Sequence, residues 1–276
     1  MSAELAGIAL DVARRAAELV RDRRASEVRV ADTKTSSTDV VTEADRASEQ
    51  LIRSLIGERR PDDAVLGEEA GSQTGTSGVR WVVDPIDGTV NFLYGIPQYA
   101  VSIAAEQDGR TVAGVVLNVA HGTEFVAHRA ADGGAVATRD GAAIAVNGPA
   151  PLAQRLVATG FSYDPAVRER QARAWGRLLP RVRDLRRLGS AALDICMVAE
   201  GGVDAYVEEG VNPWDYAAAA LVAEAAGAQV ELLAGASGMT LLVCAPRHGF
   251  AEFREAVLAC GFAADGAGVG EGSNGE

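Results

Sequence analysis

The stretch WVVDPIDGT, residues 81–89, carries the strongest structural signal in the chain. Its apolar, β-branched start predicts a buried strand that ends at Asp84. Pro85 fixes a turn, and Asp87 and Gly88 then bend the chain toward a helix. Two carboxylates on either side of a tight turn can converge, and they must then share a proton or bind a cation. Oxygen ligands without a nearby His or Cys favour Mg²⁺ over Zn²⁺. An Asp-Gly turn that only caps a helix is the structural alternative.

The same stretch offers donors for an anion. The backbone N–H groups of Gly88 and Thr89 lie where amides at a helix N-terminus bind phosphate. Lys34 is the only lysine among 26 Lys and Arg residues, which hints at a place for a compact ammonium group. A lysine placed on the surface by chance explains Lys34 equally well.

Further acidic side chains follow or precede predicted elements. Glu68 and Glu69 end a short strand, and only one can point inward because neighbouring side chains in a strand face opposite ways. Asp215 precedes an Ala-rich helix, which it could cap while also ligating a metal. Thr42 and Asp45 have the spacing of a capping box, which is the structural explanation for both. For Glu68 and Glu69, the alternative interpretation is that both are solvated loop residues. Later, Glu208 closes a strand and could reach the same cleft.

Composition and charge exclude several classes of protein. The 276 residues allow one large domain or two fused ones. A formal net charge of −12 makes nucleic acid a poor primary partner, so an anionic substrate would need bound metal ions to attract it. Three cysteines without metal-ligand spacing exclude a disulfide framework and indicate a cytoplasmic protein. No apolar run approaches the ~20 residues of a membrane helix, so we expect no membrane partner.

The hydrophobic pattern divides the chain in two. It predicts helices over 3–24 and 43–59, then an antiparallel meander of short strands separated by Asp-Gly and His-Gly turns. The predicted strands are 64–67, 80–83, 99–106, 111–119, 123–128, 134–138 and 142–146. After residues 147–151, strands alternate with helices. Predicted strands there are 155–160, 182–187, 203–208, 228–233 and 240–244, and predicted helices are 165–179, 190–200, 214–226 and 247–260. We therefore expect halves at 1–148 and 149–263, and a flexible Gly-rich tail at 264–276.

Taken together, these motifs resemble the inositol monophosphatase family of Mg²⁺-dependent, lithium-sensitive phosphatases. The resemblance covers about residues 3–260 and rests on one ordered set. The set is Lys34, Asp45, Gly67-Glu68-Glu69, the 84–89 motif with Asn91-Phe92, and Trp214-Asp215-Tyr216-Ala217-Ala218. Residues 189–192 and 201–206 resemble the bacterial members. The family implies an α/β (α+β) layered sandwich of helices and sheets, with an antiparallel-rich N-terminal half, a mixed-sheet C-terminal half and the active site between them.

The resemblance also implies roles for individual residues. Five groups would hold two Mg²⁺ ions: the carboxylates of Glu68, Asp84, Asp87 and Asp215 and the backbone carbonyl of Ile86. Such a pair clamps the attacking water and the leaving oxygen. Glu68 with Thr89 would position and deprotonate the water, and a weaker third Mg²⁺ would have Asp45 in its outer shell. The implied substrate contacts are Gly88, Thr89, Ala191, Glu208 and Asp215, and Lys34 matches a lysine near the family's active site.

The expected activity is hydrolysis of myo-inositol 1-phosphate or related polyol monophosphates by a homodimer. Phe161 stands where the animal members have a serine, so a substrate contact there cannot be transferred. The alternatives are a fructose-1,6-bisphosphatase or histidinol-phosphatase of the same superfamily. A bisphosphate would want a second basic pocket, for which Arg186 and Arg187 are candidates. A non-catalytic regulatory partner with the same fold is the remaining alternative.

Overall fold

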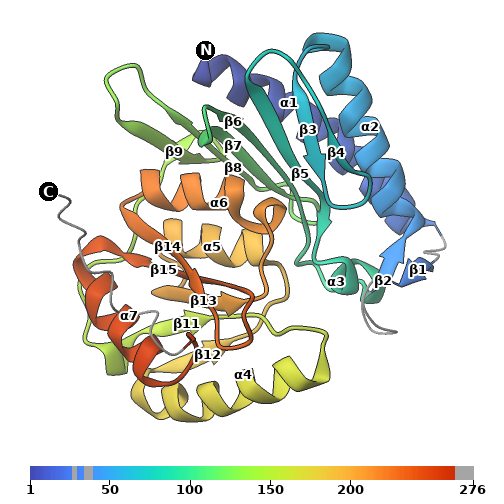
Figure 1. Cartoon of the computed structure of the whole chain (residues 1–276). Helices are drawn as coiled ribbons and strands as arrows, with labels where there is room; N and C mark the ends of the chain where they lie inside the picture. Colours follow the sequence, from blue (N-terminus) through green and yellow to red (C-terminus); the bar gives the residue numbers. More distant parts are fainter. Residues whose placement is uncertain (27–29, 34–39, 265–276) are drawn as a thin grey trace, which may run out of the picture.

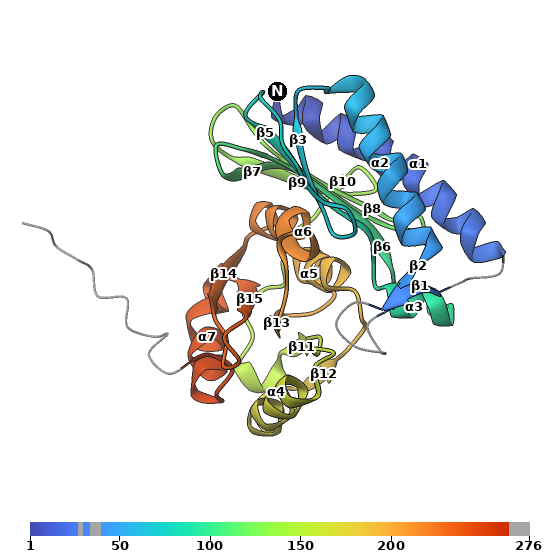
Figure 2. The ribbon, with the colours of Figure 1, turned by 45° about the vertical axis from the view of Figure 1, so that its right-hand side comes forward.

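The first predicted helix is α1 (Ser2–Ala25), whose buried stripe faces the sheet behind it. The structure is a computed structural model that describes residues 1–26, 30–33 and 40–264. The second helix, α2 (Glu43–Arg59), starts with the predicted capping box. Both helices lie on one face of the large sheet (Figure 2). Lys34 and the predicted tail, apart from Ala264, lie outside the described residues.

Eight strands form that large sheet, in the order β10-β9-β8-β7-β6-β5-β3-β4. They are β3 (Ala64–Gly67), β4 (Gly71–Gln73), β5 (Val79–Asp87), β6 (Ala100–Gln107), β7 (Arg110–Asn118), β8 (Glu124–Arg129), β9 (Ala135–Arg139) and β10 (Ala142–Ala143). The predicted antiparallel meander is confirmed from β5 to β10. β3 and β5 run parallel, because β4 returns along the outer edge of β3 before the chain enters β5. A separate antiparallel pair, β1 (Val30–Thr33) and β2 (Val40–Thr42), was not predicted.

The second half contains a mixed five-stranded sheet, in the order β12-β11-β13-β15-β14. Its strands are β11 (Leu156–Ala158), β12 (Asp184–Arg186), β13 (Ala205–Glu209), β14 (Ala228–Ala234) and β15 (Thr240–Pro246). Its helices are α4 (Pro165–Leu178), α5 (Ala191–Ala199), α6 (Pro213–Ala225) and α7 (Phe250–Ala259). Three 3₁₀ helices cover Leu152–Gln154, Leu179–Arg181 and Arg247–Gly249. β11 pairs in parallel with β12 and β13, and the other pairs are antiparallel.

The layers alternate between helices and sheets. α5 and α6 lie between the two sheets, while α4 and α7 cover the outer face of the five-stranded sheet (Figure 1). The central apolar core joins Val82 and Val116 of the large sheet to Leu221 of α6 and Tyr206 of β13. The predicted layered α/β sandwich is therefore confirmed. The separation into halves at residue 148 stays a prediction, since α5 and α6 contact both sheets.

The prediction that the strand ends at Asp84 is wrong. β5 continues to Asp87, with an irregular register between Asp84 and Asp87. Pro85 has no N–H to donate to the ladder, so the chain bulges before Asp87 pairs with Ala100. The short helix α3 (Thr89–Tyr94) then follows. The bulge therefore gives the side chains of Asp84 and Asp87 positions relative to each other that a regular strand would not give them.

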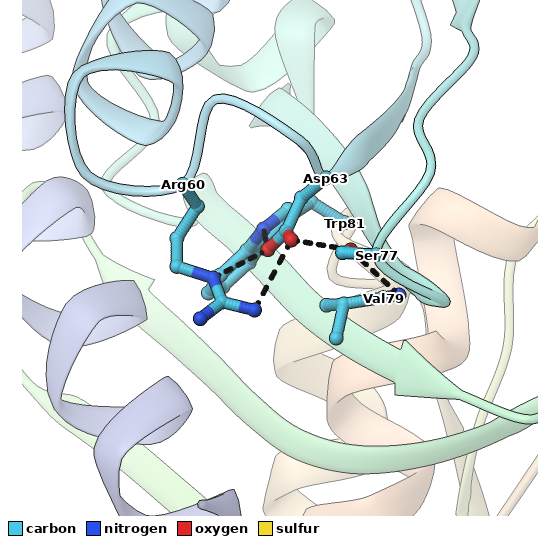
Figure 3. Close-up of polar contacts among 5 residues, drawn as sticks. All are labelled: Arg60, Asp63, Ser77, Val79 and Trp81. Atoms are coloured by element: carbon cyan, nitrogen blue, oxygen red, sulfur yellow. Dashed lines mark hydrogen bonds and ion pairs between the residues drawn. The ribbon is translucent and has the colours of Figure 1, made fainter.

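Asp63 anchors the opposite end of β5 (Figure 3). Its carboxylate accepts hydrogen bonds from Arg60 Nε at 2.8 Å, Trp81 Nε1 at 2.9 Å and Ser77 Oγ at 2.5 Å. Ser77 Oγ in turn accepts from the Val79 N–H. Burial alone would raise the pKa of Asp63, but the hydrogen bonds from Arg60, Ser77 and Trp81 outweigh it and lower the pKa. The ionised carboxylate thus stabilises the loop that leads into β5.

We expect Asp63→Asn to lower the free energy of unfolding by about 2 kcal/mol at neutral pH, because buried donors lose a charged acceptor. A lowered folded-state pKa contributes stability above the unfolded pKa and loses it as pH falls through the folded value. The difference between variant and wild type should therefore shrink in acid. Urea unfolding at neutral and acidic pH measures it. Asp11→Asn, which breaks an exposed pair with Arg59, is the control and should cost under about 1 kcal/mol.

No helix in the described part of the chain is both long enough and apolar enough to cross a bilayer.

Candidate active site

A cavity of about 490 Å³ opens where the ends of β5, β13, α5 and α6 meet. Of the predicted site residues within the described chain, all except Asp45 line it. They are Glu68, Asp84, Ile86, Asp87, Gly88, Thr89, Ala191, Glu208 and Asp215. The two halves of the chain therefore contribute to one site, as the resemblance implied.

The 84–89 segment supplies the floor of the cavity. Asp84 is 2% exposed, and its Oδ1 accepts from the Ile86 N–H at 3.0 Å, which fixes the carboxylate against the bulge. Gly88 has a φ of 94°, and a Cβ there would lie 2.9 Å from the Gln98 carbonyl oxygen. Only glycine fits this backbone comfortably. Thr89 begins α3, so its N–H belongs to the first turn, where amides have no intrahelical acceptor.

Asp87 links the two halves of the chain. Its Oδ2 accepts from Ser190 Oγ at 2.6 Å and from the Ala192 N–H at 2.7 Å. The Ala191 N–H donates to Oδ1 at 3.3 Å. Burial raises the pKa of Asp87 to about 6, although these hydrogen bonds and the charge of Arg187 oppose the shift. The start of α5 therefore holds this carboxylate at the cavity.

Asp45 does not line the cavity itself but accepts a hydrogen bond from Thr89, which does. It is fully buried, and its Oδ1 accepts from Thr89 Oγ1 at 3.0 Å. Its Oδ2 accepts from the N–H of Thr42 at 2.8 Å and from the Thr42 hydroxyl. Burial raises the pKa of Asp45 to about 6, against the hydrogen bonds from Thr42 and Thr89. Asp45 therefore contacts the cavity lining only through Thr89.

Glu208 lies on the wall formed by the second half. The Tyr206 hydroxyl donates to Glu208 Oε2 at 2.5 Å. A Cβ on Gly160 would lie within 2.3 Å of this carboxylate, so the glycine makes the space that Glu208 occupies. Burial raises the pKa of Glu208 to about 7, opposed by Tyr206 and by Arg187.

Asp215 takes part in capping α6, although it is not the N-cap residue. The N-cap is Asn212, and Asp215 is the third helical residue, with which Asn212 forms a capping box. Asp215 Oδ2 accepts from the Asn212 N–H at 2.7 Å, so the carboxylate folds back over the first turn. Burial and the charge of Asp87 raise the pKa of Asp215 well above its usual value. β3 ends at Gly67, so Glu68 and Glu69 lie in the turn that follows it and strand alternation does not apply to them. Of the two, Glu68 lines the cavity.

The donor chemistry of the cavity fits a hard divalent cation. Its candidate ligands are four carboxylates and one backbone carbonyl, all of them oxygen donors. In the described residues, no group of three or more acidic, His or Cys side chains is yet arranged to hold a metal ion. The carboxylates of Asp87 and Asp215 are held by other donors, and like charges repel. Side-chain rotation would have to bring the oxygen atoms together.

Two residues of this cavity have no role assigned from the sequence, Ser190 and Asp194. Ser190 caps α5 and donates to Asp87. Asp194 is 1% exposed, and its Oδ1 has no hydrogen-bond partner among the described residues. Arg187 lines the cavity, whereas Arg186 pairs with Asp184 on the surface. The sequence signal available for Asp194 was its position as an acidic residue within the predicted helix 190–200. Phe161 and Tyr163 also line the cavity.

Comparison with known proteins shows the family to which the chain belongs. A model of the inositol monophosphatase family matches residues 1–259. The inositol-1-monophosphatase SuhB of Mycobacterium tuberculosis is 44% identical over 261 residues, covering 88% of this chain and 90% of that protein. The Nus factor SuhB of Pasteurella multocida is 37% identical over 246 residues, covering 87% and 91%.

Structural similarity agrees with the sequence match. The solved structure of M. tuberculosis SuhB superposes with a TM-score of 0.79 at 43% identity, covering 94% of this chain and 98% of that one. The match spans both sheets and the cavity between them. The chain therefore belongs to the inositol monophosphatase family.

Proposed function

We propose that the protein is a Mg²⁺-dependent phosphatase that hydrolyses myo-inositol 1-phosphate and related polyol monophosphates to the free polyol and phosphate. The observation that carries the proposal is the meeting of four acidic side chains and the Ile86 carbonyl in one cavity. Their positions along the chain match the family's ligand order. The name of the M. tuberculosis relative supports this activity.

The metal ligands of this proposal are those that the family resemblance implies, and all of them line the cavity. Glu68, Asp84 and the carbonyl of Ile86 would hold a first Mg²⁺, and Asp84, Asp87 and Asp215 a second. A third, more weakly bound Mg²⁺ would lie near Glu68, with Asp45 in its outer coordination shell. When bound, such ions activate the attacking water and neutralise the charge on the phosphate.

The chain's own groups then handle the water proton. Glu68 accepts the proton of the attacking water as general base. The Thr89 hydroxyl has one proton, which it donates to Asp45 Oδ1 at 3.0 Å or to the Ile86 carbonyl at 3.1 Å. Its oxygen lone pairs can therefore accept a hydrogen bond from the same water. Asp45 is in this scheme a positioning residue that acts through Thr89.

Substrate binding uses both halves of the chain. The N–H groups of Gly88 and Thr89 donate to the phosphate oxygens. Glu208 and Asp215 accept hydrogen bonds from hydroxyl groups of the polyol, and the backbone at Ala191 packs against its ring. A wall of carboxylates suits a hydroxyl-rich substrate.

Two features bear on the related phosphatases. A bisphosphate needs a second basic pocket. Of the candidate pair, Arg187 lines the cavity, whereas Arg186 does not and forms an ion pair with Asp184. This favours a monophosphate over fructose 1,6-bisphosphate. A second candidate function, that of a non-catalytic regulatory partner with the same fold, is favoured by relatives named Nus factor SuhB rather than phosphatase. We further propose a cytoplasmic homodimer. The family resemblance supports the dimer, and three buried, free cysteines support a reducing compartment.

A phosphate-release panel tests the proposed function. The purified chain is given myo-inositol 1-phosphate, fructose 1,6-bisphosphate and histidinol phosphate, each with Mg²⁺, with EDTA and with added Li⁺. We expect release from the inositol ester that needs Mg²⁺ and that Li⁺ lowers by occupying the second metal site. Faster turnover of either other ester would reassign the substrate. No Mg²⁺-dependent release from any ester would favour the non-catalytic role.

A further inference from the structure

A second cavity, of about 280 Å³, lies on the other side of α6 from the active site. It is walled by α6 and by the ends of β5, β6, β7 and β8 that lie away from Asp84. The side chains that line it are Arg80, Glu106, Arg110, Thr111, Arg129, Pro213, Tyr216, Ala217, Ala220, Leu221 and Glu224. Figure 2 shows α6 against the large sheet, in the layer that forms this wall.

One stripe of α6 faces this second cavity. Pro213, Tyr216, Ala217, Ala220, Leu221 and Glu224 recur at the three- and four-residue spacing of a single helix face. Trp214 and Asp215, on the same first turn, line the active-site cavity instead. The first turn of α6 therefore separates two cavities and contributes side chains to both.

The second cavity has more basic than acidic side chains, unlike the active-site cavity. Three guanidinium groups and two carboxylates line it. The active-site cavity has one arginine against seven acidic side chains, and the whole chain has a formal net charge of −12. A locally positive cavity on a strongly anionic protein has the charge that an anionic ligand requires.

Two of the three arginines are already oriented. Arg80 Nη2 lies 2.6 Å from Glu106 Oε2. Arg129 Nε donates to the Thr111 carbonyl oxygen at 2.9 Å, and its Nη2 lies 3.4 Å from Glu224 Oε2, which is a long contact. Arg80 Nε also donates to Glu106 Oε2, at 2.8 Å. A guanidinium group has five N–H donors, so both arginines have donors beyond those that these contacts use.

Arg110 supplies the unmatched charge. It begins β7 beside the Asp108-Gly109 turn, is exposed, and makes no hydrogen bond or ion pair with the described residues. Glu106 and Glu224 are engaged by Arg80 and Arg129, so neither neutralises Arg110. Guanidinium groups bind tetrahedral oxyanions through paired N–H donors.

We propose that this second cavity binds a small phosphate-type oxyanion, held by Arg110 together with Arg80 and Arg129. Its volume is below the usual range for drug-sized ligands and suits a free phosphate or a small phosphate ester. The Tyr216 ring forms part of the α6 wall of this site. This site is separate from the proposed catalytic cavity and needs no metal ion.

Equilibrium dialysis of the metal-free chain in EDTA, at low salt, tests the proposal with radiolabelled orthophosphate. Removing metals leaves the acidic active-site cavity without a cation to attract the anion, so catalysis and this binding are measured separately. We expect one saturable site per chain, weakened about tenfold by Arg110→Gln. Arg170→Gln removes an exposed arginine from α4 and should change the affinity by less than about twofold.

Competition identifies the source of the oxyanion. Sulfate should displace the label, and glycerol should not, because only the former has the charge and tetrahedral oxygens. Stronger displacement by glycerol 2-phosphate than by unlabelled orthophosphate assigns the site to a phosphate ester, and the reverse order assigns it to free phosphate. No saturable binding, or binding that Arg110→Gln leaves unchanged, overturns the proposal.

Discussion

Replacing Asp87 with Asn is expected to abolish Mg²⁺-dependent phosphate release, with a loss on the order of 10³-fold or more. Both oxygens of Asp87 accept hydrogen bonds from the start of α5, namely from Ser190 and from the amides of Ala191 and Ala192. An Asn side chain has only one acceptor oxygen, and its NH₂ group replaces the other. This NH₂ group would lie against hydrogen-bond donors and could not accept from them. It also lacks the negative charge that a divalent cation requires.

The experiment combines two measurements on the same variant. Phosphate release with saturating Mg²⁺ gives the activity, and calorimetric titration with Mg²⁺ gives the metal affinity, which should fall as well. Asp132→Asn changes an exposed carboxylate in the β8–β9 turn and serves as the matched control. A thermal melt shows whether the variant folds. A folded Asp87→Asn chain with wild-type turnover would contradict the ligand assignment.

Glu68→Gln is expected to lower the rate by on the order of 10²–10⁴, the range typical of a lost general base. Gln keeps the shape of Glu and retains an oxygen that can approach a metal ion. It cannot accept a proton from water, so kcat should fall more than the affinity for Mg²⁺. Steady-state kinetics over a range of Mg²⁺ concentrations separate the two effects.

The adjacent residue is the control for this second variant. Glu69 follows Glu68 directly but does not line the cavity, and Glu69→Gln should retain most of the activity. Full activity in Glu68→Gln would refute the role of Glu68 as base. Equal losses in the two variants would show that lining the cavity does not distinguish Glu68 from Glu69.

Local patterns predicted most of the elements, because periodicity depends only on neighbouring residues. Helices α1 and α2 and the strands from β5 to β9 fall close to their expected ranges. Parallel pairing between β3 and β5 was not predictable, since it depends on where β4 returns. Pro85 interrupts the ladder within the segment, but the pairing of Asp87 with Ala100, which extends β5 beyond the bulge, depends on β6 and could not be predicted from the segment alone.

The candidate site shows the same limit. The acidic residues were selected by their place at the ends of elements and by their resemblance to a family. Their partners were not, because Ser190 is 103 positions away from Asp87 in the sequence. The second, basic cavity had no sequence signal at all. Arg80, Arg110 and Arg129 lie on three strands, and only the sheet brings them together.

The position of α5 and α6 between the two sheets affects the order in which the protein can fold as it is made. The apolar face of the large sheet, including Val82, Ala104 and Val116, is covered by helices encoded about a hundred residues later. On the ribosome, α5 and α6 cannot both cover this face until residue 225 has left the exit tunnel. The nascent chain at that stage offers an apolar surface to chaperones and to other unfinished chains.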